Sequence, residues 1–123
     1  MVEVTNEIPS IIKRWAKAIS LQKPRLMSNF YCRNAVLVGT YSTPYEVGIN
    51  QIYKYFTDFL SSSNMSCTII EQTCQHIGEL KVSSGIYEFT ANGEIIKARF
   101  TYTIIPRNGE DKILNHHSSV YEG

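Results

Sequence analysis

The sequence predicts an α+β protein in which helices come first and a curved antiparallel sheet follows. Two observations support this fold class. Apolar residues in the first sixty positions recur at helical spacing, whereas the second half is rich in β-branched and aromatic residues with turn signals between the segments. Separate helical and hairpin regions are typical of α+β proteins. Strands as long as these curl, so we expect the helices to pack in the concavity of the sheet.

The first helix is expected over residues 6–20. Asn6 suits the cap position, and Pro9 falls in the first turn, where a missing N–H is tolerated. One face of this helix is apolar, because its hydrophobic residues recur three and four positions apart. The residues of this face are Ile8, Ile11, Ile12, Trp15 and Ile19.

Two more helices and a strand are expected before residue 65. Pro24 suits the first position of a second, short helix. Ala35–Val38 has the composition of a strand, and residues 40–47 that of a loop with a Thr-Pro turn. A third helix follows Gly48, and a Ser-Ser-Ser-Asn run at 61–64 ends it.

Four long strands joined by short turns are expected in the second half of the chain. Their expected ranges are 65–77, 80–90, 95–105 and 112–121. Asn92-Gly93 is a typical two-residue hairpin turn. Cys67 and Cys74 are seven positions apart in one strand, so regular alternation predicts that they point to opposite faces.

Charge and cysteine content exclude several classes of protein. The chain of 123 residues fits one domain over residues 1–123, and its 12 Lys and Arg against 11 Asp and Glu leave a net charge of +1. This balance does not favour nucleic acid as a partner. The three cysteines form no CxxC pair, and no nucleotide-binding fingerprint is present, so neither a metal nor a cofactor is expected. Without a signal peptide or an apolar span, a cytoplasmic location outside the membrane is expected.

Several stretches resemble one known family, and the resemblance extends over about residues 6–122. They are Trp15, the segments 31–39 and 48–60, and the strand segments 85–90, 98–101 and 116–119. In this order they resemble the calcium/calmodulin-dependent protein kinase II association-domain-like group, near the polyketide-cyclase-like and ketosteroid-isomerase-like families of the nuclear-transport-factor-2-like superfamily. The resemblance implies a cystatin-like cone with a pocket inside it. It also implies a homo-oligomer, most simply a dimer, built through the outer face of the sheet.

Arg99 is the first candidate for a ligand-binding residue. It lies within an apolar strand, and an arginine in such a position needs either a partner or a polar cavity. One interpretation is a clamp for a small-molecule carboxylate. The other is a structural ion pair with Glu88 or Glu94. The resemblance places an arginine of the family's pocket at this position.

The His116-His117 pair is the second candidate. Adjacent strand residues point to opposite faces, so these two imidazoles cannot bind one metal ion from a regular strand. The resemblance implies that His117 points inward together with Asn115 and Ser119. An inward His117 could act as a catalytic acid or base, or donate a hydrogen bond to a ligand. The alternative is a histidine that is merely hydrogen-bonded in the core.

Three tyrosines, Tyr31, Tyr53 and Tyr87, are the aromatic candidates for the pocket wall, since a buried hydroxyl needs a partner. The first hypothesis is therefore an oligomerising domain whose pocket binds a small, anionic molecule. The alternative is an isomerase, cyclase or hydratase that uses His117 and Arg99. A third hypothesis is a structural domain that packs one sheet face on another chain. That face would consist of Ala98, Phe100, Tyr102 and Ile104.

Overall fold

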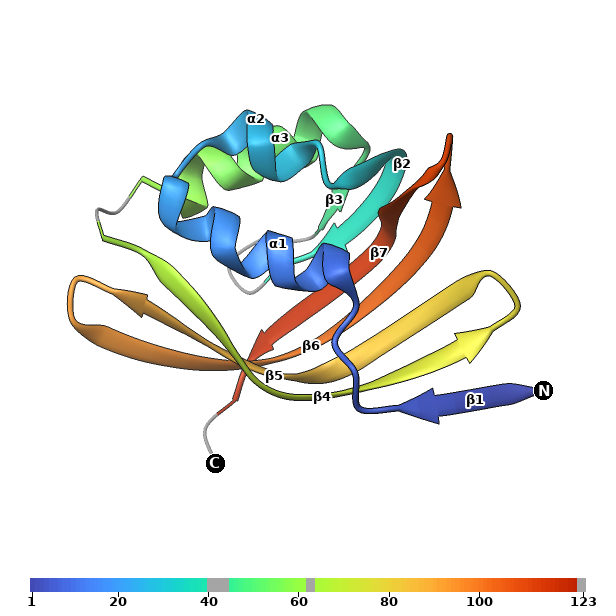
Figure 1. The fold of residues 1–123 in the computed structure, drawn as a ribbon. Helices are drawn as coiled ribbons and strands as arrows, with labels where there is room; N and C mark the ends of the chain where they lie inside the picture. The colour runs from blue at the N-terminus through green and yellow to red at the C-terminus, as the bar shows by residue number, and fades with distance from the viewer. Residues whose placement is uncertain (40–44, 62–63, 122–123) are drawn as a thin grey trace.

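A strongly curved sheet carries the helices on its concave side, as Figure 1 shows. The computed structural model describes residues 1–39, 45–61 and 64–121. The elements in chain order are β1 (Val2–Thr5), α1 (Ser10–Ala18), the 3₁₀ turn η1 (Ile19–Leu21), α2 (Pro24–Ser28), β2 (Tyr31–Val38), β3 (Glu46–Val47), α3 (Ile49–Phe59), β4 (Ser66–Ile77), β5 (Leu80–Ala91), β6 (Glu94–Arg107) and β7 (Glu110–Val120). The α+β class and the placement of the helices in the cone are confirmed.

The strands form one sheet in the order β1-β4-β5-β6-β7-β2-β3. All neighbouring strands are antiparallel except β2 and β7, which run parallel. The sheet is therefore mixed, whereas the sequence predicted a purely antiparallel one. The reason is that β2 comes from the helical half of the chain and joins the far edge of the meander beside the last strand.

Helix α1 begins at Ser10, four residues later than expected. Pro9 occupies the cap position with extended backbone angles, so the expectation that Asn6 caps this helix is wrong. Asn6 instead accepts a hydrogen bond on its carbonyl oxygen from the Gln72 amide at 2.8 Å. This bond holds the connection between β1 and α1 against β4.

The other helices begin where the sequence predicted. Pro24 is at the first position of α2. Gly48 precedes α3 with φ +89°, a conformation that favours glycine. β2 begins at Tyr31, four residues earlier than expected, and β1 was not predicted at all. The predicted loop over 40–47 contains the short strand β3, and its residues 40–44 lie outside the described part of the chain, as do residues 62–63 of the run that was expected to end α3.

The hairpin turns follow the sequence closely. Asn92 and Gly93 have φ values of 52° and 85°, and Asn108 and Gly109 have values of 51° and 85°. Two consecutive left-handed residues make the primed turns that match the twist of paired strands. The four long strands are thus confirmed, with ends that differ from the predicted ones by no more than two residues.

Strands β4 and β7 each contain a β-bulge that reverses which of the following residues face inward. In β4, Ile69 pairs with Tyr87 and Glu71 with Ile86, so Ile70 has no counterpart in β5. Beyond this extra residue the alternation changes phase. Cys67 and Cys74 consequently both lie on the inner side of β4, so the expectation of opposite faces is wrong.

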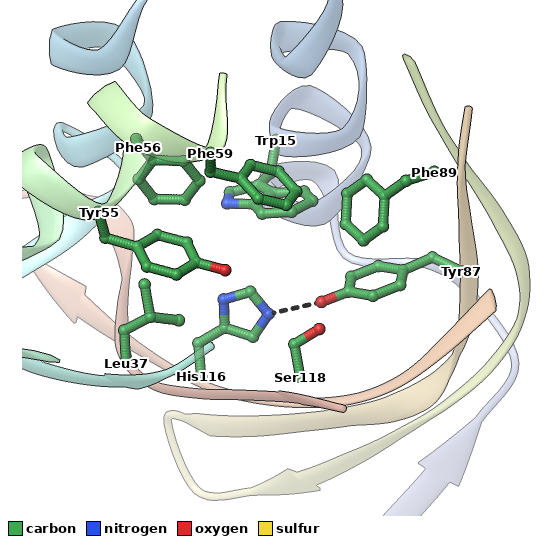
Figure 2. Close-up of a pocket in the computed structure, with 9 residues that line it drawn as sticks. All are labelled: Trp15, Leu37, Tyr55, Phe56, Phe59, Tyr87, Phe89, His116 and Ser118. Carbon is green, nitrogen blue, oxygen red and sulfur yellow. Dashed lines mark hydrogen bonds between the residues drawn. The ribbon is translucent and has the colours of Figure 1, made fainter. Parts of the chain in front are cut away.

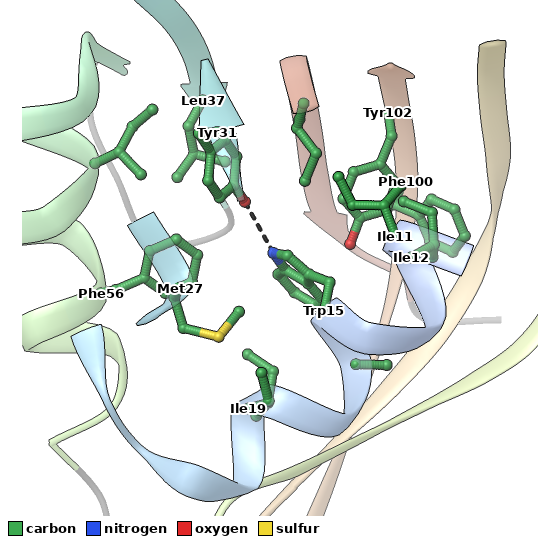
Figure 3. Packing of buried hydrophobic residues seen from close by; sticks show 14 of the residues in the cluster. Ile11, Ile12, Trp15, Ile19, Met27, Tyr31, Leu37, Phe56, Phe100 and Tyr102 are labelled. Carbon is green, nitrogen blue, oxygen red and sulfur yellow. Dashed lines mark hydrogen bonds between the residues drawn. The ribbon is translucent and has the colours of Figure 1, made fainter. Parts of the chain in front are cut away.

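The core lies between the concave face of the sheet and the helices. Figure 3 shows Ile11, Ile12 and Trp15 of α1 close to Phe100 and Tyr102 of β6. The face of β6 that carries these two aromatic residues, with Ala98 and Ile104, is at most 3% exposed, so it packs under the helices and not on another chain. None of the helices in the described ranges has the length and hydrophobicity of a membrane span.

Candidate functional site

The second bulge, in β7, places His116 inside the cone. Ile113 pairs with Ile104, and Asn115 pairs with Thr103, so Leu114 is the extra residue. Ile113 faces the core before the bulge, and His116 and Ser118 face it afterwards. His116 is 2% exposed and Ser118 is 6% exposed.

Hydrogen bonds occupy both nitrogens of the His116 ring. The Tyr31 hydroxyl lies 2.8 Å from Nδ1, and the Tyr87 hydroxyl lies 3.1 Å from Nε2. Trp15 donates its indole N–H to the Tyr31 hydroxyl at 3.1 Å. Strands β2, β5 and β7 and helix α1 thus meet in one polar chain at the centre of an aromatic core.

Aromatic rings pack closely around this polar chain. The Tyr102 ring stacks on the imidazole with a centroid distance of 4.0 Å and an interplanar angle of 16°. Trp15 meets His116 edge-on at 5.4 Å and stacks on Tyr87 at 5.8 Å. The buried Tyr102 hydroxyl has no hydrogen-bond partner among the described residues.

Burial sets the protonation of this cluster. Burial, and to a smaller extent charge repulsion from the neighbouring His117, lowers the pKa of His116 to about 3. Burial also raises the pKa of the Tyr31, Tyr87 and Tyr102 hydroxyls well above their usual value. At neutral pH the imidazole is therefore uncharged and the three phenols keep their protons.

A small cavity opens beside His116 (Figure 2). It encloses about 240 Å³ including its open mouth, and about 10 Å³ of this can take the centre of a water molecule. That inner space holds about one water molecule. The lining residues are Trp15, Leu37, Tyr55, Phe56, Phe59, Tyr87, Phe89, His116 and Ser118.

The cavity wall is aromatic and uncharged. In Figure 2, the hydroxyls of Tyr55, Tyr87 and Ser118 point toward the space around the imidazole. None of the lining residues is an Asp, Glu, Lys or Arg. Within the described ranges, no group of three or more His, Cys, Asp or Glu side chains is placed to hold a metal ion.

Two of the candidate site residues lie in the cone. Tyr31 and Tyr87 are buried and bind the two nitrogens of His116. Tyr53 is half-buried on α3, does not line the cavity and lies under Arg25, whose guanidinium carbon is 4.0 Å from the ring centroid.

The other candidate residues lie on the convex face, so the predicted facing is wrong. Asn115 and His117 are exposed and Ser119 is half-buried on the outer side of β7. Arg99 pairs with Ser119 in the register, and its guanidinium carbon lies 4.9 Å from the centroid of the Tyr121 ring. In β7, the bulge at Leu114 turns the predicted inward residues outward. In β6, Ala98 and Phe100 face the core, so Arg99 between them faces outward.

Sequence reasoning missed His116, Ser118 and Tyr55 as site residues. The one signal in β7 is the pair of adjacent apolar residues Ile113 and Leu114. In a regular strand one of them would face outward, so an adjacent apolar pair before a polar run can mark a change of phase.

Solved structures of other proteins share the architecture of this chain. A Xanthomonas campestris protein named as a calcium/calmodulin-dependent protein kinase II association domain is 29% identical, with a TM-score of 0.84 over 91% of this chain and 84% of its own. A Pseudomonas putida protein named NTF2-like is 13% identical, with a TM-score of 0.80 over 92% and 83%. The chain has the fold of the nuclear-transport-factor-2-like superfamily. No family model and no curated protein matches its sequence.

A further neighbour with the NTF2-like fold was solved with a small molecule. It is a Catenulispora acidiphila protein with a ketosteroid-isomerase-like fold, in complex with trimethylamine. It is 16% identical, with a TM-score of 0.66 over 95% of this chain and 88% of its own. At this identity the likeness concerns the fold alone.

Proposed function

We propose that this chain is an association domain that pairs with a second copy of itself and holds a small organic molecule in its cone. The convex face of the sheet carries the association half of the proposal. Helices pack on the concave side alone in the described part of the chain, which leaves the outer side of β4 to β7 open. An antiparallel sheet with one uncovered face can remain in water or pack on a partner.

The convex face is divided by charge. Its central rows across β4, β5, β6 and β7 are Glu71-Ile86-Arg99-Ser119, Thr73-Ser84-Thr101-His117 and Gln75-Val82-Thr103-Asn115. Glu71 and Glu88 lie on β4 and β5, whereas Lys97 and Arg99 lie on β6, and the Lys97 ammonium is 4.0 Å from the Glu88 carboxylate of the same chain. A two-fold axis along the strands would place the acidic half of one copy over the basic half of the other. Such complementarity selects partners and orientation.

The Xanthomonas campestris protein supports the association half, since it is named as an association domain and is the neighbour with 29% identity. The cavity beside His116 supports the other half. The trimethylamine complex of the Catenulispora acidiphila protein is consistent with a small organic ligand in a protein of this fold.

The geometry gives no support to the carboxylate ligand or to the catalytic alternative. An anion in the cavity would meet no lining cation, because Arg99 and His117 lie on the convex face. Acid–base catalysis works best with a pKa near the working pH. The pKa of His116 is far below that range, and no carboxylate lines the cavity.

Light scattering coupled to size-exclusion chromatography tests the association half. We expect a particle of twice the chain mass, which falls toward a monomer as the protein is diluted. Changing Lys97 and Arg99 together to Glu replaces the two basic side chains by acidic ones, so like charges oppose one another across the two-fold axis. The dimer dissociation constant should then rise by about tenfold or more.

A matched control changes Lys13 and Lys17 to Glu, which alters the net charge by the same amount on the exposed side of α1. This variant should associate like the unchanged protein. Association through the convex face would be contradicted if the unchanged protein stayed monomeric at high concentration. It would also be contradicted if both variants weakened the dimer equally.

A further inference from the structure

We propose that the exposed side of the helical layer is a docking surface for an acidic protein segment. Such a segment carries several Asp or Glu side chains with leucine-like residues between them. This proposal is independent of the cone pocket and of association through the convex face. It rests on the charge, the exposure and the ring contacts of residues on α1, η1 and α2.

Charge is divided unevenly along the chain. Residues 8–45 include six Lys or Arg and no Asp or Glu, whereas the rest of the chain has six Lys or Arg and eleven Asp or Glu. The overall charge of +1 does not show this division. The basic segment contains α1, η1 and α2, so this part of the helical layer is basic and the remainder of the protein is acidic.

Five of these basic side chains are exposed on α1, on α2 and just before α2. They are Lys13, Arg14, Lys17, Lys23 and Arg25. None of the five has an ion-pair partner among the described residues, whose ion pairs involve Lys81, Lys97 and Lys112. Glu7 before α1 and Asp58 on α3 are also exposed and form no ion pair within the same ranges. Positive charges that lack counter-charges steer an acidic partner toward this surface.

Aromatic rings hold two of the cations in place. The guanidinium carbon of Arg25 lies 4.0 Å from the centroid of the Tyr53 ring, and that of Arg14 lies 5.9 Å from the centroid of the Phe30 ring. These contacts join α2 to α3, and α1 to the segment that follows α2. A guanidinium on a ring still presents its N–H groups at the edge. It also loses less conformational freedom when it binds a carboxylate through two parallel hydrogen bonds.

The same ring contacts argue against two other acidic partners. Single-stranded nucleic acid binds where its bases stack on free aromatic rings, and helices that lie on membranes insert apolar side chains that include aromatic ones. Phe30 and Tyr53 are half-buried and lie against the arginines, so these two rings do not protrude from the surface. A protein segment with carboxylates needs no free ring.

Two leucines give the surface an apolar component. Leu21 in η1 is 57% exposed, and Leu26 on α2 is 36% exposed. Each lies within two residues of Lys23 or Arg25 in the chain. Apolar side chains placed between the acidic residues of a partner would cover these leucines and gain the free energy of burial.

Binding is tested by fluorescence anisotropy with a labelled peptide in which pairs of Glu alternate with single Leu residues. A peptide with Gln in place of each Glu keeps the length and the apolar content without the charge. We expect the Glu peptide to bind, with a dissociation constant that rises with salt, because screening shortens the reach of exposed charges from about 10 Å at 0.1 M to about 3 Å at 1 M. The Gln peptide should bind about tenfold more weakly or less.

Charge-reversal variants locate the site. Changing Lys13 and Lys17 together to Glu should weaken binding of the Glu peptide about tenfold or more. Changing Lys97 and Arg99 together to Glu alters the net charge equally on the convex face and should leave this affinity unchanged. Arg25→Lys keeps the charge but loses the pair of parallel hydrogen bonds, so it should weaken binding about threefold. All five side chains are exposed, so the variants should fold, which circular dichroism checks.

Three results would overturn the proposal. The first is equal binding of the Glu and Gln peptides, and the second is equal weakening by the two double variants. The third is tighter binding of an oligothymidylate of the same charge, or of vesicles of phosphatidylserine in phosphatidylcholine, which would assign the surface to another partner. Light scattering measures the oligomeric state separately, so a failure here leaves association through the convex face standing.

Discussion

The two faces of the sheet differ more than their sequences suggest. The concave face buries His116 among tyrosines and tryptophan, with both ring nitrogens hydrogen-bonded. The convex face exposes His117, its neighbour in the chain, beside Thr and charged residues. A shift of one residue in the alternation of a strand decides whether a side chain faces the neutral, aromatic interior or the polar surface. Function on this fold therefore depends on where each strand changes phase.

The bulges decide this phase. Leu114 in β7 and Ile70 in β4 are single extra residues. Each moves the side chains that follow it in the strand to the opposite face. A regular strand would have put His117 inside, as the sequence analysis expected. The bulges therefore determine which residues lie on each face, and deleting single strand residues tests this.

Deleting single strand residues should give the largest effects. Deleting Leu114 removes the bulge and leaves His116 on the concave face, so the protein should fold at a cost of about 1–3 kcal/mol. Deleting Thr101 from the regular part of β6 moves the residues on one side of the deletion to the wrong face. That variant should not fold. Circular dichroism and urea unfolding would check both, and equal stability of the two variants would break the account of the bulges.

Alanine at the two histidines should give the next largest difference. His116→Ala leaves a cavity and removes a partner from both Tyr31 and Tyr87, so unfolding should become easier by about 3–5 kcal/mol. His117→Ala changes an exposed side chain and should stay within about 0.5 kcal/mol. Urea unfolding at one protein concentration measures both. Similar losses at the two positions would contradict the assignment of the faces.

Acid should weaken the protein through His116. The pKa of this residue falls from 6.5 to about 3 on folding, so the unfolded chain binds a proton between these values and the native state does not. The stability that comes from keeping His116 neutral is fully present above pH 6.5. It is lost as the pH falls toward 3, by up to about 1.4 kcal/mol for each pH unit. The difference in unfolding free energy between the unchanged protein and His116→Gln should therefore slope over this range. A His117→Gln variant should keep the slope.

Removing the Tyr102 hydroxyl should have the smallest effect. This group is buried without a hydrogen-bond partner among the described residues, so Tyr102→Phe should leave stability unchanged or raise it by up to about 1 kcal/mol. Tyr87→Phe removes a bonded hydroxyl and should cost about 1 kcal/mol. Thermal unfolding of the two variants compares them directly. A clear loss in Tyr102→Phe would mean that its hydroxyl has a partner, such as a buried water.

Much of the fold could be predicted from local patterns. The apolar stripe of α1, Pro24 at the start of α2, and the Asn92-Gly93 turn each act within a few residues, so the sequence carries them directly. β1 could not be predicted, because four residues gain their strand conformation only by pairing with β4. The parallel contact of β2 with β7 likewise joins distant parts of the chain.

The candidate site was predicted less well, for a physical reason. Tyr31 and Tyr87 were chosen because buried hydroxyls need partners, and they do contact a buried histidine. Which histidine lies inside depended on the bulge at Leu114, and that bulge is set by the pairing with β6. Arg99 was predicted to face inward because it lies in an apolar strand. The apolar residues of β6 face the core, however, and Arg99 lies on the opposite face.

An NMR titration of the histidine rings tests the central claim most directly. The claim is that His116 is the residue sealed in the aromatic interior, so its ring should remain neutral as the pH falls through 5 and should titrate at about 3. Assignment with His116→Gln and His117→Gln variants identifies each signal. A His116 ring that titrates near the ordinary value of 6.5 in the folded protein would place it in water and contradict the account.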